Sequence, residues 1–387
     1  MSRPTEAYIG GVGMTHFGKW PEVPLRAMSS EAVSASLADA GVSAADVEVA
    51  FFANSLGGLL VGQEALRGEV CLHDAGIFGI PIVNVENACA GGATALWSAV
   101  RAVRSGEFRV ALAVGAEKMF VGDTQRTLAA LQTAADVATT QGQGLQFVAL
   151  YAMRLQQRLD AGLLTKEHLA LVTRKGKANG VENEYAQFRT AMTDAEILGG
   201  RVIAGPLTLP MVSGISDGAA AVVVIGRPSG SSGVCVTASV LSSGSVDGLG
   251  ETVVGTTIRR AYLEAGVGPE DLDVAEVHDA VSPAELFRYE ELGLCGTGEA
   301  GALLESGATA VGGRIPVNPS GGLTARGHPV AATGLAQIAE LTWQLTGRAG
   351  RRQVDGCRVA LAQNSGGWID GDTGAGSVHI LQNRSGE

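Results

Sequence analysis

The chain has 387 residues, which a soft prior of roughly 150 residues per domain divides into two or three domains or lobes. Its formal net charge is −11 and it has no cluster of lysine and arginine, so we do not expect it to bind nucleic acid or an anionic membrane surface. Glycine is abundant, with 55 residues, and only 17% of residues are charged, so much surface is expected in close packing, part of it in an oligomer interface.

The cysteines and the apolar runs indicate the compartment. Five cysteines are scattered without a C-x-x-C pair, and an odd number does not fit a disulfide framework, which favours a reducing compartment. The N-terminal residues Met1–Glu6 lack the apolar core of a secretory signal, and the run Gly218–Gly226 is too short to span a bilayer. We therefore expect a soluble cytoplasmic protein without a membrane span.

The sequence contains an internal repeat. Ala40–Ala50 and Ala265–Ala275 share the pattern A-G-V-x-x-x-D-[VL]-[ED]-V-A, and both read as the end of a helix, a glycine stop and a strand. Three further matches follow in the same order: Ile80–Asn84 with Ile315–Asn318, Ala93–Leu96 with Ala332–Leu335, and Arg109–Ala113 with Arg358–Ala362. Four ordered matches favour a duplicated chain.

Each half reads as helix, strand, loop, helix and strand, an alternation typical of a mostly parallel sheet covered by helices. Two such halves predict sheets stacked about a pseudo-twofold axis. We assign residues 1–116 and 206–228 to the first half and 234–387 to the second. Residues 117–205 form an insertion with helices predicted at Leu145–Ala161 and Lys166–Asn179, and we expect it to carry substrate contacts.

Cys89 stands where the strand Pro81–Val85 gives way to a helix-compatible run that ends near Arg104. At a helix N-terminus the free N–H groups and the dipole favour a thiolate, and Ala90 and Gly91 leave room for a substrate. A lone cysteine is also often a small buried apolar residue. From this segment alone, both interpretations stay open.

The second half places His328 at the matching position, in Gly321–Pro329 before a helix that starts near Ala331. A pseudo-twofold axis would bring this turn towards Cys89, which predicts a nucleophile and a base. His278 and Asp279 end a second apolar strand, at an edge where parallel sheets carry their sites.

A glycine-rich turn, Gln363–Gly367, is predicted after the strand Arg358–Ala362, and its N–H groups are able to face an oxyanion. A histidine at a strand end, such as His278, or a glycine-rich turn is by itself more often structural than functional. Among the other histidines, His16 stays a candidate for a cleft, whereas His168 and His379 are expected to be structural.

The sequence predicts neither a metal site nor a dinucleotide site. The H-E-x-x-H pattern and paired C-x-x-C motifs are absent. The segment Gly10–His16 lacks the third glycine of G-x-G-x-x-G. We therefore expect no bound metal and no nucleotide cofactor.

Taken together, these segments resemble the thiolase superfamily, in particular the branch similar to the thiolase domain of sterol carrier protein X and to thiolase-like lipid-transfer proteins. The resemblance spans the whole chain. The segments that carry it are Asn87–Gly92, Ser216–Gly218, Val277–Ala280, Asn318–Gly322, Gly327–Pro329 and, in the insertion, Tyr185–Arg189.

The resemblance implies a five-layered αβαβα fold of two similar halves with an inserted loop domain, in a homodimer or tetramer. It implies Cys89 as the nucleophile that accepts the acyl group and His328 as its base. His278 would stand in the oxyanion hole of the second acyl group, and the backbone N–H groups of Cys89 and Gly366 would hold the thioester oxyanion. The insertion would meet coenzyme A, so the substrate is an acyl-CoA thioester and no cofactor is bound.

One departure from the family pattern bears on the reaction. Thiolases carry a second cysteine that moves the proton on the substrate α-carbon, and the two positions where it occurs are Asn364 and Ala280 here. Neither side chain can act as a thiol acid or base, although Asn364 and Asp279 remain candidate supporting residues. We expect an acyltransferase that works through Cys89 without ordinary thiolysis.

Two other functions are weighed against this one. A retro-aldolase acting on a β-hydroxyacyl-CoA, such as a steroid side chain, needs no covalent thioester, so the retained Cys89 ranks acyl transfer first. A non-catalytic acyl-CoA-binding subunit has no need for Cys89, His278 and His328 together. Similar proteins often act with a small OB-fold and zinc-ribbon subunit, so a partner of that kind is also expected.

Overall fold

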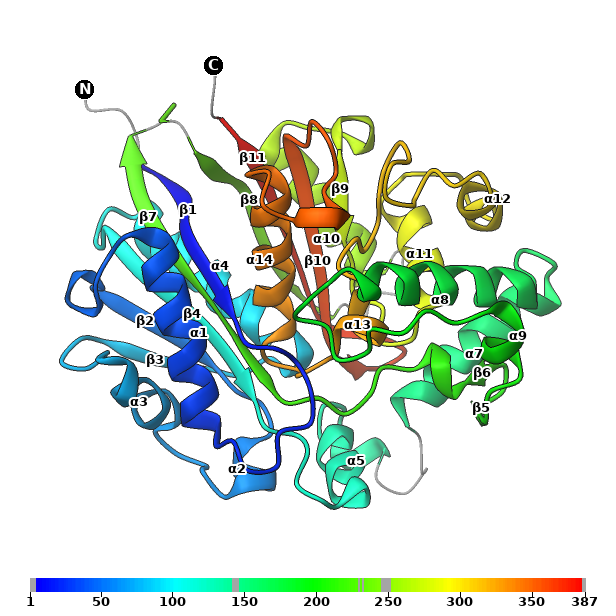
Figure 1. Ribbon diagram of the computed structural model, residues 1–387, viewed down its shortest axis with the longest axis horizontal. Helices are drawn as coiled ribbons and strands as arrows, with labels where there is room; N and C mark the ends of the chain where they lie inside the picture. Colours follow the sequence, from blue (N-terminus) through cyan, green and yellow to red (C-terminus); the bar gives the residue numbers. More distant parts are fainter. Residues whose placement is uncertain (1–4, 141–145, 229, 232, 245–251, 385–387) are drawn as a thin grey trace.

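The computed structural model describes residues 5–140, 146–228, 230–231, 233–244 and 252–384 (Figure 1). The elements of the first half are β1 (Thr5–Met14), α1 (Leu25–Ala40), β2 (Val49–Ala53), α2 (Gly57–Val61), α3 (Arg67–Leu72), β3 (Ile82–Val85), α4 (Gly91–Arg104), β4 (Val110–Glu117) and, after the insertion, β7 (Gly218–Pro228). Those of the second half are β8 (Val234–Ser243), α10 (Val253–Ala265), β9 (Val274–Glu276), α11 (Ala284–Glu291), α12 (Ala300–Glu305), α13 (Gly322–Arg326), α14 (Thr333–Leu345), β10 (Val359–Ile369) and β11 (Asp372–Asn383).

The segment between β4 and β7 is mainly helical. Helices were expected at Leu145–Ala161 and Lys166–Asn179, and both are confirmed, although Leu145 lies outside the described residues. The elements are α5 (Thr124–Gln132), α6 (Val137–Thr140), α7 (Phe147–Asp160), α8 (Lys166–Val181), α9 (Asp194–Leu198), β5 (Val202–Ala204) and β6 (Leu207–Thr208). The boundaries 117 and 205 remain our proposal.

The strand order repeats in the two halves. The first half runs β3-β2-β4-β7-β1 and the second β8-β11-β10-β9, and among the described residues Tyr8 of β1 pairs with Cys235 of β8 to join the two. In the second half Val317 bridges Ala275 in parallel, which is the place that β3 takes beside β2. The duplication inferred from the sequence therefore agrees with the order of the strands.

The expectation of a mostly parallel sheet is wrong, because the sheet is mixed. Strands β2, β3 and β4 are parallel, as are β9 and β10, but β7 pairs antiparallel with β1 and β4, and β11 with β10 and β8. The β10–β11 connection is a two-residue turn in which Asp370 and Gly371 both have positive φ, at 46° and 95°. Asp-Gly is a strong hairpin signal, and it dictates an antiparallel pair.

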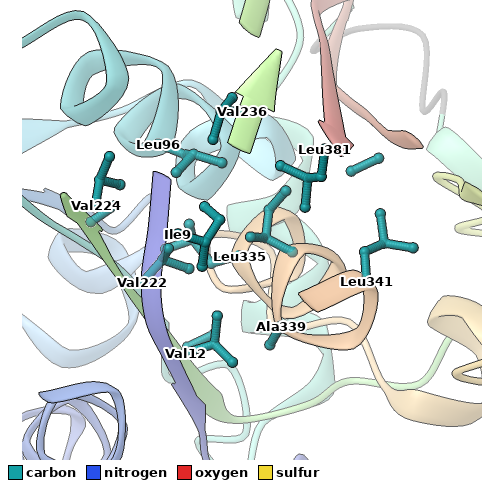
Figure 2. Close-up of a cluster of buried hydrophobic side chains, with 14 of the residues drawn as sticks. Ile9, Val12, Leu96, Val222, Val224, Val236, Leu335, Ala339, Leu341 and Leu381 are labelled. Carbon is teal, nitrogen blue, oxygen red and sulfur yellow. The ribbon is translucent and has the colours of Figure 1, made fainter. Parts of the chain in front are cut away.

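The helices and the two halves of the sheet form five layers, which confirms the αβαβα architecture. Helices α4 and α14 lie in the centre and contact strands of both halves, while α1 covers the outer face of the first half and α10 that of the second (Figure 1). Figure 2 shows this core between the halves, with buried side chains from β1, α4, β7, β8, α14 and β11: Ile9, Val12, Leu96, Val222, Val224, Val236, Leu335, Ala339, Leu341 and Leu381.

Small residues let the two central helices approach closely. A Cβ atom on Gly92 would lie 2.4 Å from the Ala331 carbonyl oxygen, and one on Gly334 would lie 2.7 Å from the Ala93 nitrogen. Both contacts join the first turn of one helix to the first turn of the other or to the residues just before it. The packing therefore brings the N-terminal ends of α4 and α14 together.

Among the helices of the described residues, none is both long and apolar enough to cross a membrane.

Substitution of Gly334 by alanine tests this packing. Because the added methyl group would press on the backbone of Ala93, we expect Gly334→Ala to lower the free energy of unfolding by about 1–3 kcal/mol. The matched control is Gly255→Ala in α10, where the nearest atom is 3.4 Å from the new Cβ and a gain of up to about 1 kcal/mol is expected. Urea denaturation measures both, and equal effects in the two variants would contradict the packing argument.

Candidate active site

Three side chains singled out in the sequence converge in the structure. The Cys89 sulfur and one ring nitrogen each of His278 and His328 lie within 4.8 Å of one another. The two imidazole rings meet edge to face, with centroids 5.2 Å apart. Cys89 lies in a short 3-10 turn, Ala88–Ala90, directly before α4, while His278 follows β9 and His328 follows α13. The fold thus unites residues that are 239 positions apart, from 89 to 328.

His328 is held as a neutral imidazole with a defined tautomer. Its Nδ1 lies 2.7 Å from the Thr333 hydroxyl, which itself donates to the Pro329 carbonyl at 3.0 Å. The hydroxyl therefore accepts from Nδ1–H, and the Nε2 lone pair is left for Cys89. Burial, followed by the charge of Arg326, lowers the pKa of His328 to about 3. The ring is a proton acceptor at neutral pH.

His278 is also buried and neutral. Its backbone N–H donates to the Gln363 side chain at 3.1 Å, which fixes the end of the strand. Burial is the main cause that holds its pKa well below the ordinary value, and the charges of His328 and Arg288 add to it. Its Nδ1 has no partner among the described residues. A buried nitrogen without a partner is suited to a substrate hydrogen bond.

The Cys89 thiol is protonated in the resting site. Burial, and next the negative charge of Glu117, raise the pKa of Cys89 to about 12, and a hydrogen bond from the Gly367 backbone opposes the rise only in part. The backbone N–H groups of Cys89 and Gly367 lower the pKa of the thiol, as expected beside a helix N-terminus, but burial raises it more. A thiolate requires proton transfer to a neighbouring base.

Glu117 is a feature that the sequence did not reveal. This wholly buried carboxylate at the end of β4 accepts hydrogen bonds from the backbone N–H groups of Ser55 and Leu56 at 3.1 and 3.0 Å, and from the Asn54 amide at 2.9 Å. Burial raises its pKa to about 7 despite these bonds. Glu117 thereby holds the loop after β2 and adds negative charge near Cys89.

The predicted glycine-rich turn Gln363–Gly367 is instead part of β10, so that expectation is corrected. Gly366 pairs with Ala375 of β11, whereas Gly367 has a φ of 65° and interrupts the regular register. The hairpin of β10 and β11 extends the strand beyond its apolar residues. A Cβ on Gly366 would lie 2.4 Å from the Asn87 carbonyl oxygen, so only glycine lets this strand approach the turn of Cys89.

The three converging side chains line an open cavity with about 1120 Å³ of empty space. Its walls are mainly apolar and come from both halves and from α7 of the insertion, which contributes Phe147, Tyr151 and Arg154. Cys89 also borders a second open cavity, with about 980 Å³ of empty space. The apolar walls suit an apolar part of a substrate.

Comparison with known proteins identifies the family. The family models "Thiolase, N-terminal domain" and "Thiolase C-terminal domain-like" match residues 7–149 and 240–382. An acetyl-CoA acetyltransferase of Methanothermobacter thermautotrophicus is 39% identical over 96% of this chain and 98% of its own length. This chain belongs to the thiolase superfamily. Family membership makes it a thiolase-like acyltransferase.

Other relatives agree with this assignment. The benzoylsuccinyl-CoA thiolase subunit BbsB of Thauera aromatica is 37% identical, with 95% of this chain and 96% of the relative covered. Sterol carrier protein 2 of Rattus norvegicus is 35% identical over 94% of this chain and 70% of its own length, which confirms the resemblance to that branch. The solved structure of an Ltp2-ChsH2(DUF35) aldolase has a TM-score of 0.81 at 24% identity, covers 98% of both chains and shows the same fold.

The two positions where other thiolases have a second cysteine, 280 and 364, have different surroundings in this structure. Ala280 lines the cavity beside His278. Asn364 does not line it, and its amide donates to Gln337 at 3.0 Å inside the core. Cys89 is the only cysteine among the described residues that line the cavity.

The other candidates lie outside the cavity wall. The Asp279 carboxylate is buried and accepts from the backbone of Leu323 at 2.8 Å, so it supports the segment before His328. His16 contacts the Glu184 carbonyl on the surface, His168 caps α8 and pairs with Glu305, and His379 is buried against Ser239 and the Ala93 carbonyl. The structural interpretation of His168 and His379 agrees with these contacts, and none of the three histidines lines the cavity of Cys89.

Alkylation of Cys89 measures the effect of Glu117 on the pKa of this thiol. Because the negative charge of Glu117 raises the pKa of Cys89, Glu117→Gln should move the pH profile of iodoacetamide labelling at Cys89 to lower pH. We expect labelling at pH 8 to accelerate several-fold, up to about tenfold for a shift of one pH unit. Glu86→Gln removes an exposed charge that also raises this pKa and should have a smaller effect. Unchanged or slower labelling in a folded Glu117→Gln protein would refute the effect.

Proposed function

We propose that this chain is an acyl-CoA acyltransferase that carries the acyl group on Cys89. The observation that supports this most directly is the convergence of one thiol and two neutral imidazoles, within 4.8 Å, on the wall of a large apolar cavity. Acyl-CoA thioesters are the substrates of the thiolase superfamily to which the chain belongs. These residues need no further chemical group to transfer an acyl group from the thiol of coenzyme A to the thiol of Cys89.

The proposed step starts with the Nε2 of His328 taking the proton of the Cys89 thiol. The sulfur then attacks the thioester carbonyl carbon, and the backbone N–H groups of Cys89 and Gly366 receive the oxyanion, with Gly367 beside them. When the C–S bond to coenzyme A breaks, the leaving thiolate takes the proton from the His328 imidazolium. The products are acyl-Cys89 and free coenzyme A, so protons and charges balance.

The second half of the reaction delivers the acyl group to an acceptor. His278 lines the cavity, and its buried Nδ1 has no partner among the described residues, so we assign its ring to the carbonyl oxygen of the acceptor. No thiol is available to exchange an α-proton, because Ala280 occupies that place in the wall. We therefore propose that ordinary thiolysis is weak.

We propose that the insertion, residues 117–205, meets coenzyme A and that the chain forms a homodimer through β3. This strand is at the edge of the sheet, and Val83 on it is 45% exposed. Two more large apolar side chains, Leu66 and Phe78, are 63% exposed on the preceding segments. An apolar edge strand calls for a covering partner.

A smaller partner subunit is also part of the proposal. The relative BbsB is a subunit of a benzoylsuccinyl-CoA thiolase, which supports a second chain in such assemblies. The expected partner carries an OB-fold and a zinc ribbon.

Acylation of Cys89 is the central test. Incubation with acyl-CoAs should add one acyl mass to the protein. The protein is first treated with EDTA, because Cys89, His278 and His328 are also suited to binding Zn²⁺, which would block the thiol. Cys89→Ser should abolish the adduct, while Cys235→Ser, a buried cysteine outside the cavity, should retain it. His328→Ala should slow acylation by roughly 10²–10⁴-fold, the usual contribution of a general base.

A different product would select the alternative. If no acyl-CoA labels the wild-type protein but a β-hydroxyacyl-CoA is cleaved to a carbonyl product, the retro-aldolase replaces the acyltransferase. Binding without either reaction would favour the non-catalytic subunit.

Thiolysis tests the missing cysteine. We expect little cleavage of acetoacetyl-CoA by the wild-type protein, and an increase in Ala280→Cys, because residue 280 faces the cavity. Asn364→Cys is the matched control and should have less effect, because residue 364 points into the core. A spectrophotometric assay of thioester loss measures the rates, and rapid thiolysis by wild type would show that the second thiol is dispensable.

A further inference from the structure

Arg288 is a charged residue in the cavity that the proposed reaction does not use. It lies on α11, its side chain is only 2% exposed, and it lines the same cavity as Cys89 and His278. Among the described residues of the cavity wall, Arg288 and Arg154 are the charged ones, and no acidic residue lines the wall. The mainly apolar wall therefore carries a positive charge at Arg288 and Arg154.

One edge of the Arg288 guanidinium is unused. Its Nη1 donates to the Glu291 carboxylate, which also accepts from the Thr252 hydroxyl at 2.9 Å. Its Nε is buried and has no hydrogen-bond partner among the described residues. A guanidinium binds two groups through two edges, and a buried N–H left unpaired is unfavourable until a ligand accepts from it.

Arg154 adds a second positive group to the same wall. Its guanidinium stacks on the Phe287 ring at 5.0 Å, and it makes no ion pair with a described residue. Burial raises the pKa of Tyr151, and the charges of Arg288 and Arg154 both oppose this rise, so both act on one phenol of the cavity wall. Glu291 thus compensates Arg288 from behind, while Arg154 remains without an acidic partner.

We propose that the cavity selects acyl-CoA substrates whose acyl group carries a carboxylate, which binds the guanidinium of Arg288 and is attracted by Arg154. This inference rests on the proposed function, because it places the substrate carbonyl at Cys89. It adds the chemical class of the acyl group.

The place of Arg288 favours the acyl group over the phosphates of coenzyme A. Arg288 is close enough to His278 to contribute to its lowered pKa, and His278 lies beside Cys89. In an acyl-CoA the phosphates are separated from the thioester by the whole pantetheine arm. An anion held next to the reacting carbon is therefore part of the acyl group.

Binding to a protein that cannot be acylated tests this inference separately from the chemistry. In Cys89→Ala, calorimetry compares three pairs of equal length: succinyl-CoA with butyryl-CoA, glutaryl-CoA with valeryl-CoA, and adipyl-CoA with hexanoyl-CoA. For at least one pair we expect the carboxyacyl-CoA to bind about tenfold tighter or more, as a charge-assisted hydrogen bond allows.

The variants identify the residue responsible. Arg288→Gln combined with Glu291→Gln removes the buried pair without leaving an unpaired acid, and it should reduce the preference to about twofold or less. Arg158→Gln is the matched control, because Arg158 also stacks on Phe287 but pairs with Glu290 and does not line the cavity, so the preference should persist.

Equal affinities within all three pairs would overturn the inference, as would a preference that survives the double substitution. Acylation of wild-type Cys89 is measured in parallel. Failure of every acyl-CoA to label Cys89 would refute the acyltransferase, whereas labelling with no preference for a carboxylate would refute only the role of Arg288.

Discussion

The site depends on the contact between the first turns of α4 and α14. Gly92 lies against the carbonyl of Ala331 and Gly334 against the backbone of Ala93, at separations that leave no room for larger side chains. Two helices from different halves of the sheet can meet this closely only through small residues. This contact holds the turn of Cys89 and the segment of His328 on one wall.

Burial then determines the electrostatic state of that wall. In the same dry surroundings the pKa of Cys89 rises to about 12 and that of His328 falls to about 3, so the thiol and this imidazole both rest in their neutral forms. The thiol and the imidazole therefore stay uncharged until the reaction with a substrate forms an oxyanion that the site can hydrogen-bond. Glu117 is tied to backbone donors and opposes early ionisation of the thiol.

The two halves have kept one topology and diverged in function. The first half supplies the nucleophile, and the second supplies both histidines and the strand β10 that passes the turn of Cys89. The insertion closes the cavity with α7, and α11 of the second half adds Arg288. The catalytic residues and the residues proposed to select the acyl group thus come from different segments. Substrate preference can therefore change without loss of the catalytic residues.

The sequence by itself determined the duplication, the helices α7 and α8, and the segments of Cys89, His278 and His328, because apolar periodicity and short motifs are local properties. Its errors were also local: the turn at Gln363–Gly367 proved to be a strand, because pairing with β11 extends β10 beyond its apolar residues. Only the tertiary structure decided which way Asn364 and Ala280 face, the rise in the pKa of Cys89, the closeness of Glu117 to Cys89 and the presence of Arg288 at the cavity. Those properties arise from burial and from contacts between residues far apart in the chain, and no local pattern contains them.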